Sequence, residues 1–489
     1  MRAKLFIALP AALAISSLAA AADITQGDTI VVTATRTPIP LSDATVPVAV
    51  ITREDIELSL SSDLAELLRF QAGIDIGRNG GPGQATSVFL RGTESNHTLV
   101  LIDGVRMNPS TIGGAAVQNI APETIERVEI VKGARSALYG TDAIGGVVNV
   151  ITRRADERHI EGSIGVGSFA TQSWRLSGGN RGIDSEFGFS LNSQSTDGYA
   201  PRIDSDIERG YDNLSANVYG LKRFGPTEIS VRHWRAEGTA EYLDFFLNPV
   251  DQDFENAVTS IALESRLSEE GVSKLMLSLA RDEIGQNQAP DFVKSERLGL
   301  DWQYSHAFEN NTVTGGLYVV DESASSLSFG TGFDEDTLIR AVFLQNQLSL
   351  GRHKGFLAMR VTNHENFGSH TTWNAEYAFE INDALSLNLG LAHAFRAPDA
   401  SDRFGFGGRP DLEPELADER QLSLRYTPDD RHSFNIELYA NNIEDLIEFN
   451  FETFTLQNLD EAEVRGAQIG YEYRGENCVL RADLVRQRA

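Results

Sequence analysis

The feature that most constrains this chain is an alternation of apolar and polar residues, which recurs in short stretches after about residue 155. The segments 385–391 and 434–438 are two examples, reading LSLNLGL and FNIEL. A period of two is typical of a β-strand with one apolar and one polar face. Spacing typical of helices is scarce in this part of the chain. The sequence therefore predicts that residues 156–489 form an antiparallel, all-β unit.

Two architectures satisfy this pattern. A soluble sandwich buries its apolar faces in a core, whereas a membrane barrel turns them toward lipid and lines its interior with polar side chains. The polar faces carry Asn, Gln, Arg, Asp and Ser, and turns and longer acidic loops separate the strands. These features, together with a signal for export, favour the barrel. Strands that span lipid require a closed barrel, because an open edge leaves unpaired backbone groups in hydrocarbon.

The export signal is at the start of the chain. Arg2 and Lys4 precede an apolar, Ala-rich run that ends at Ala20-Ala21-Ala22, before Asp23. A basic start, an apolar core and small residues at the end are typical of a secretory signal peptide, expected here at residues 1–22. A membrane-anchor helix is the alternative interpretation. No later apolar run reaches the roughly 18 residues that a membrane-spanning helix needs.

Charge and residue usage exclude several functions. The chain has 42 Lys and Arg against 70 Asp and Glu, a formal net charge of -28, which would repel nucleic acid. The single cysteine, Cys478, excludes a disulfide scaffold and argues against a cysteine-based metal site. The nine histidines form no His-x-x-x-His pair. No nucleophile–base pair is evident, so we expect neither an enzyme nor a catalytic cofactor.

The region before residue 155 has a different character. Leu64, Leu67 and Leu68 lie at helical spacing after Ser61 and Ser62, which are candidate N-caps. Pro122 fits the first turn of a short helix. Strands are expected at 98–104, 125–133 and 145–153. These elements predict a compact mixed α/β domain.

Three ordered blocks of this domain resemble the plug of TonB-dependent outer-membrane receptors: LLRFQAGIDI (67–76), SVFLRGTESNHTLVLIDGVRMN (87–108) and IERVEIVKGARSALYGTDAIGGVVNVITR (125–153). The stretch 395–415 is similar to a barrel segment of the same family. The resemblance implies a plug at residues 23–155 inside a transmembrane β-barrel at residues 156–489. It also implies a monomer surrounded by outer-membrane lipid in a Gram-negative bacterium.

The stretch DTIVVTA resembles the TonB box, the peptide that these receptors offer to the periplasmic protein TonB. Recognition of such a peptide by β-augmentation uses main-chain pairing, so its sequence demands are loose. The residues are Asp28, Thr29, Ile30, Val31, Val32, Thr33 and Ala34.

The resemblance also suggests a ligand. The segments DTIVVTATRTP, GGPGQATSVFLRGTESNHTLVLIDGVRMNP and 241–260 are most similar to the cobalamin transporters of the family. A siderophore receptor is the alternative within the family, and a passive porin-like channel is the alternative outside it. By resemblance, two plug loops face the ligand, with the candidate residues Gly81, Gly83, Gln84, Ala85, Thr86, Met107, Asn108 and Ser110.

An acidic loop, STDGYAPRIDSDIERGYDN (195–213), is the best metal candidate, because Ca²⁺ prefers six to eight hard oxygen ligands. The alternative is a solvated acidic loop. The family resemblance adds two residues of the next loop, although Ala200 stands where the family has an aspartate. The candidate calcium ligands are Asp197, Asp204, Asp206, Glu208, Asp244 and Asp251.

Two further expectations concern the assembly of the barrel. Arg91 and Arg135 should form ion pairs that hold the plug in the barrel. At roughly 20 residues per strand with its connections, residues 156–489 provide about 16 strands, against about 22 in plugged barrels. The chain also ends in ADLVRQRA, without an aromatic-terminated closing strand, so we expect a C-terminal truncation. Either the barrel then closes with fewer strands, or the protein is not functional in this form.

Overall fold

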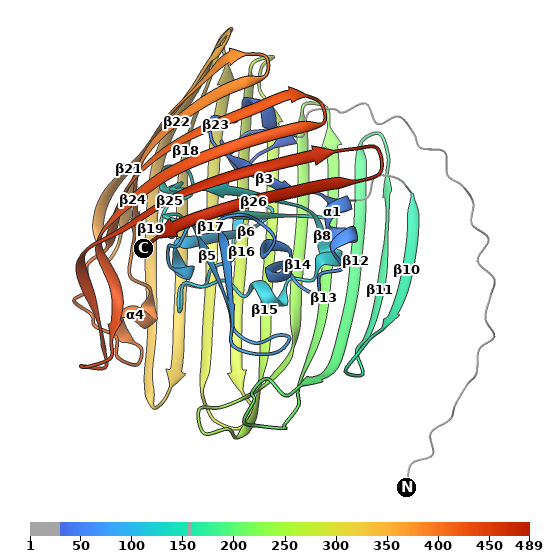
Figure 1. The fold of residues 1–489 in the computed structure, drawn as a ribbon, viewed down its shortest axis with the longest axis vertical. Helices are drawn as coiled ribbons and strands as arrows, with labels where there is room; N and C mark the ends of the chain where they lie inside the picture. The colour runs from blue at the N-terminus through green and yellow to red at the C-terminus, as the bar shows by residue number, and fades with distance from the viewer. Residues whose placement is uncertain (1–29, 155–157) are drawn as a thin grey trace, which may run out of the picture.

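A single antiparallel sheet curves around a smaller N-terminal domain in the computed structural model, which describes residues 30–154 and 158–489 (Figure 1). The curved sheet is the predicted barrel wall, and the domain inside it is the predicted plug. The predicted signal peptide, Asp28, Thr29 and the predicted boundary at 155/156 lie outside the described residues.

The wall contains 17 strands, one more than expected, and each pairs with its neighbours in sequence order. Connections are short at one end of the wall, called here the short-turn end. The opposite, long-loop end carries the segments 200–208 and 397–414. The strands are β10 (His159–Val166), β11 (Gln172–Arg181), β12 (Ser185–Tyr199), β13 (Arg209–Phe224), β14 (Thr227–Leu243), β15 (Pro249–Arg266), β16 (Gly271–Gln286), β17 (Phe292–Ala307), β18 (Asn311–Ser328), β19 (Thr331–Leu350), β20 (His353–His364), β21 (Gly368–Asn382), β22 (Leu385–Arg396), β23 (Glu415–Asp429), β24 (His432–Asn450), β25 (Thr455–Arg474) and β26 (Val479–Arg488).

The two faces of the wall differ as the alternation predicts. Leu298 and Leu357 point outward and are 59% and 60% exposed, whereas Arg297 and Gln345 are buried against the plug side. An exterior of apolar side chains and an interior of polar ones is the arrangement of a membrane barrel rather than a sandwich. The predicted fold class is therefore confirmed.

The wall is open along one side, because no ladder joins β10 to β26 among the described residues. Figure 1 shows them as two separate edges, with β26 crossing obliquely over the plug. The plug fills the space that the wall surrounds, and the diameter of a barrel grows with its strand number. A wall of 17 strands therefore curves around this plug without bringing its edges together. Arg481 of β26 instead forms an ion pair with Asp55 of the plug at 3.2 Å.

The plug is built on a five-stranded mixed sheet in the order β3-β8-β9-β6-β7, in which β6 and β9 are parallel. The three predicted strands correspond to β6, β8 and β9. The strands of the plug are β1 (Ile30–Val31), β2 (Ile39–Pro40), β3 (Val48–Ile51), β4 (Ile74–Arg78), β5 (Thr86–Leu90), β6 (Thr98–Ile102), β7 (Val105–Arg106), β8 (Ile125–Lys132) and β9 (Gly146–Thr152).

Two short helices, α1 (Arg53–Ser59) and α2 (Leu64–Leu68), pack beside this sheet. The N-cap of α2 is Asp63 rather than Ser61 or Ser62. Asp63 accepts a hydrogen bond from the amide of Glu66 at 3.0 Å and also pairs with Arg78, which the serines could not do.

The remaining helical turns are short. Pro122 begins a 3₁₀ turn (Pro122–Thr124), as predicted. The segment α3 (Ser136–Tyr139) lies in the plug, and α4 (Ala400–Phe404) lies in the long loop between β22 and β23. In the described part of the chain, none of the helices has the length and apolar character of a transmembrane span.

Candidate functional site

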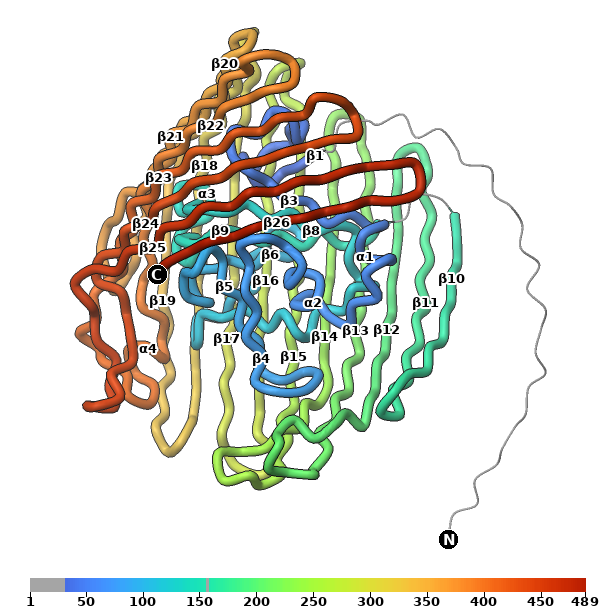
Figure 2. Tube along the Cα trace, viewed as in Figure 1, coloured from blue at the N-terminus to red at the C-terminus, as the bar shows by residue number. Residues whose placement is uncertain are grey.

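The predicted TonB box lies at the short-turn end of the molecule, where Figure 2 labels β1. Val31, Thr33 and Ala34 are buried. The Glu129 carboxylate of β8 accepts hydrogen bonds from the amides of Val32 and Thr33, both at 2.9 Å, and from the Thr33 hydroxyl at 2.7 Å. The main chain of this segment is therefore bound to the plug.

Other plug groups complete this attachment. The guanidinium of Arg127 donates to Glu129 at 2.7 and 2.9 Å and so balances its charge. Tyr139 donates to the carbonyl oxygen of Thr33, and the Asn149 amide donates to the Thr33 hydroxyl, both at 3.0 Å. β-Augmentation needs free main-chain groups. The segment would therefore have to leave Glu129 before a partner strand could pair with it.

The first predicted ligand loop lies between β4 and β5, at the long-loop end. Gly83 has φ +71°, and a Cβ at this position would come within 2.0 Å of the Tyr211 ring of β13. The Gln84 side-chain amide donates to the carbonyl oxygen of Glu241 in β14 at 3.1 Å. Gly81, Gly83 and Gln84 are buried, Thr86 is half-buried, and Ala85 is exposed. The loop is therefore fixed against the wall and presents Ala85 outward.

The second predicted ligand loop is shaped by Asn108. Its side chain accepts from the amide of Val100 at 2.7 Å and donates to the carbonyl oxygens of Thr98 and Gly113 at 3.0 and 2.7 Å. Met107 and Ser110 are also buried, and Ser110 bonds the Ser295 hydroxyl of the wall at 2.8 Å. The exposed residue of this loop is Ile112, at 46%, which the sequence analysis did not single out.

The predicted calcium ligands do not gather in one place. Asp204 is bound to Arg202 by two hydrogen bonds of 2.9 Å, which lower the pKa of its carboxyl. Asp244 accepts from Asn248, and Asp251 accepts from Asn287 and Gln288. In the described ranges, no three of the six candidates bring ligand oxygens within 4.8 Å of one another. The other three candidate ligands are Asp197, Asp206 and Glu208. Calcium binding stays a prediction.

The predicted plug–wall ion pairs are confirmed. Arg91 lies 3.1 Å from Glu419 and 3.0 Å from Glu437, and Arg135 pairs with Glu376. All five side chains are buried, with exposures of 1–7%. Their carboxylates come from the wall strands β21, β23 and β24, so these pairs fasten the plug at several points.

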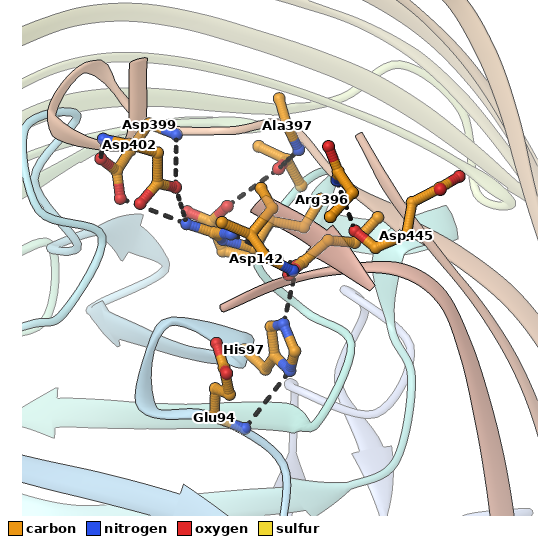
Figure 3. Close-up of polar contacts among 12 residues, drawn as sticks. Glu94, His97, Asp142, Arg396, Ala397, Asp399, Asp402 and Asp445 are labelled. Carbon is orange, nitrogen blue, oxygen red and sulfur yellow. Dashed lines mark hydrogen bonds and ion pairs between the residues drawn. The ribbon is translucent and has the colours of Figure 1, made fainter. Parts of the chain in front are cut away.

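A further plug–wall cluster surrounds Arg396, at the end of β22 (Figure 3). Its guanidinium lies 3.2 Å from Asp399, 2.6 Å from Asp402 and 3.3 Å from Glu415. The His97 Nε2 of the plug is 2.8 Å from Glu415. Burial raises the pKa of the Asp399 carboxyl well above its ordinary range.

Glu94 joins His97 and Glu415 to form the one group among the described residues whose ligand atoms could hold a metal ion. The His97 Nδ1 accepts from the Glu94 amide at 3.3 Å, which assigns the Nε2 proton to the bond with Glu415. Because Glu415 already bonds Arg396, His97 and the Ile447 amide, this geometry favours a structural contact between plug and wall over a cation site.

Comparisons with known proteins agree with this architecture. Residues 40–147 match the model of the TonB-dependent receptor plug domain, and residues 161–485 match that of the TonB-dependent receptor-like β-barrel. The vitamin B12 transporter BtuB of Photobacterium profundum is 29% identical over 490 residues, covering 96% of this chain and 80% of the relative.

Solved structures share the fold at low identity. The siderophore receptor PirA of Acinetobacter baumannii superposes with a TM-score of 0.75 at 18% identity, over 90% of this chain and 80% of that one. The FrpB iron transporter of Neisseria meningitidis gives a TM-score of 0.78 at 14% identity, over 90% and 79%. The barrel model alone matches well over half of the chain, and this protein therefore belongs to the TonB-dependent receptors of the outer membrane.

Proposed function

We propose that this protein carries cobalamin across the outer membrane, driven by TonB. The likeness to BtuB over 96% of the chain supports the ligand, and it agrees with the sequence blocks of the plug. In this proposal, cobalamin binds at the long-loop end, TonB pairs with residues 28–34 at the short-turn end, and movement of the plug releases the ligand into the periplasm.

The attachment of the TonB box to Glu129 is the observation that carries the mechanism. Thr33 is bonded to β8 through Glu129, to β9 through Asn149 and to α3 through Tyr139. The segment therefore has two alternative partners, the plug and the incoming TonB strand. A pull on the segment acts on the central sheet of the plug, because β8 and β9 are its middle strands.

Ligand contacts are assigned to the two plug loops. Ala85, next to β5, and Ile112 are exposed residues of these loops, and Gly83 lets the first loop lie against Tyr211. The other candidates in these loops then serve to shape them. Asp197 and the acidic residues of the loop 200–208, together with Asp244 and Asp251, are proposed to bind Ca²⁺ when ligand and ion order the long-loop end.

Binding and uptake test this proposal separately. Labelled cyanocobalamin should bind saturably to outer membranes that contain the protein, and a calcium chelator should weaken the binding. Deletion of residues 28–34 should abolish uptake and leave binding intact. A heat-shift gel of the same membranes serves as the control for folding.

Each alternative gives a different result in these assays. Folded protein that binds ferric chelates instead of cobalamin would identify a siderophore receptor. Ion conductance that persists after deletion of residues 28–34, without saturable ligand binding, would identify a passive channel. Uptake that survives the deletion would refute the role of TonB.

A further inference from the structure

A cavity of about 550 Å³ lies between the plug sheet and the inner face of the wall. Leu101 of β6 and Asn149 of β9 line it on the plug side, and Lys274 and Arg360 line it on the wall side. Val32 of the TonB box and Arg36, two residues after the box, form part of the boundary of the cavity. The cavity is therefore on the side of the plug opposite the predicted ligand loops.

Charged side chains of both signs line this cavity, in a chain with a formal net charge of -28. Seven cationic side chains and five carboxylates line it. Four of the cations are paired with carboxylates: Arg36 with Asp301, Arg106 with Asp142, Arg127 with Glu129 and Arg232 with Asp103. Lys274 lies opposite Glu264 on the neighbouring strand, but no ion pair joins them.

Arg360 of β20 is the most unusual of these cations. It is 2% exposed, and its Nε donates to the Thr362 hydroxyl at 3.0 Å. Its guanidinium carbon lies 5.0 Å from the centroid of the Tyr318 ring. No carboxylate within the described ranges forms an ion pair with it, and its two Nη atoms have no hydrogen-bond partner there.

The plug leaves room for this side chain at Gly140, where an added Cβ would be 3.3 Å from one Nη atom. A guanidinium that lines a cavity without a counter-charge can be stabilised by an anion bound beside it. The planar fork of the two Nη atoms matches the geometry of a phosphate or carboxylate group.

We infer that this cavity is an anion-binding subsite in which Arg360, with Lys274 and Arg36 nearby, binds a phosphate or carboxylate group of a passing ligand. The volume is in the range of small-molecule sites, roughly 300–1,000 Å³. It is suited to the anionic part of a large chelate rather than to the whole molecule. The inference rests on the proposed function only for the source of the anion, which in cobalamin is the phosphodiester.

Inorganic phosphate tests the subsite directly. The purified, detergent-solubilised full chain is titrated with phosphate in a calorimeter. Binding should be saturable, with a Kd of ~1 mM, which corresponds to a binding free energy of about -4 kcal/mol. Arg360→Gln should weaken it by about tenfold or more, whereas Arg360→Lys, which keeps the charge but not the planar fork, should weaken it less. Arg281→Gln, at a paired arginine outside the cavity, is the matched control and should change nothing.

Two results would overturn the subsite: no saturable phosphate binding by the parent, or unchanged binding by the folded Arg360→Gln variant. A heat-shift gel shows whether each variant folds. If Arg360→Gln does not fold, Lys274→Gln replaces it, because Lys274 is only half-buried and its substitution disturbs the fold less. Lys274→Gln should weaken phosphate binding by about threefold. Unchanged binding by that variant would then refute the inference.

Uptake distinguishes the source of the anion. Arg360→Gln should slow the uptake of cobalamin by about tenfold and leave its binding at the long-loop end unchanged. The same variant should not slow the uptake of cobinamide, because cobinamide lacks the phosphodiester. Equal slowing of both would overturn the role of the phosphodiester. If the parent takes up neither corrinoid, the proposed function fails, and the phosphate titration still decides whether the subsite exists.

Discussion

The ion pair between Arg135 and Glu376 gives the sharpest test of how the plug is held. Both side chains are buried, at 1% and 2% exposure, and the Nε and one Nη of Arg135 have no other partner. Glu376→Gln removes the counter-charge and leaves a buried guanidinium. The cost of breaking such a pair is about 3–5 kcal/mol. The plug should therefore unfold at a lower denaturant concentration than in the parent.

The size of the shift follows from the slope of a urea titration. With a slope of about 2 kcal/mol per molar, a loss of about 4 kcal/mol moves the midpoint by roughly 2 M. A fluorophore on a cysteine at the exposed position Ala85, in a Cys478→Ser background, reports unfolding of the plug. A heat-shift gel reports the state of the wall.

Two controls make this reasoning refutable. Replacing both partners, with Arg135→Met and Glu376→Leu, should restore most of the lost stability, because neither charge is then buried alone. Glu296→Gln breaks an exposed pair with Arg281 and should cost less than about 1 kcal/mol. A midpoint for Glu376→Gln within the range of this surface control would show that the pair does not hold the plug.

Three further predictions concern the loops, the TonB box and pH. Gly83→Val should push the first loop away from Tyr211 and weaken ligand binding by about tenfold or more in equilibrium titrations, whereas Gly114→Ala, with open space around it, should not. Glu129→Gln should loosen residues 30–34, seen as faster cleavage there by a protease, and unchanged cleavage would exclude the attachment. Burial raises the pKa of Glu94, so the folded plug binds more protons than the unfolded chain between the ordinary and raised values. Its unfolding free energy should fall as pH rises through that window, and Glu94→Gln should flatten this slope in urea titrations.

The wall was predictable because its signal is local. Alternation over a few residues fixes which side chains face lipid, and Leu298 and Leu357 behave accordingly. The cap of α2 was missed for a related reason. Three adjacent residues offered side-chain oxygens, and the choice of Asp63 also depends on its pairing with Arg78, fifteen residues away.

The site depends on contacts that a local pattern does not contain. The side-chain amide of Gln84, a predicted ligand contact, bonds Glu241, which is 157 residues away, and no local pattern indicates this partner. The acidic loop was predicted from closeness in sequence, yet Asp204 is paired with its neighbour Arg202. For Arg396, a signal was available: aspartates three and six residues later form the capping box of α4, which places their carboxylates beside the guanidinium.

The strengths of the contacts suggest an order of events during transport. Glu129 holds the TonB box by three hydrogen bonds to a charged group, each worth about 1.5–3 kcal/mol, whereas the plug is also held by the buried pairs of Arg91 and Arg135. A pull on the box should therefore release it before the plug leaves the wall. Val32 bounds the cavity, so its release from Glu129 removes part of that boundary, while Arg36 stays paired with Asp301 and the pairs of Arg91 and Arg135 stay intact. An anion bound at Arg360 would then reach the short-turn end past a plug that remains in place.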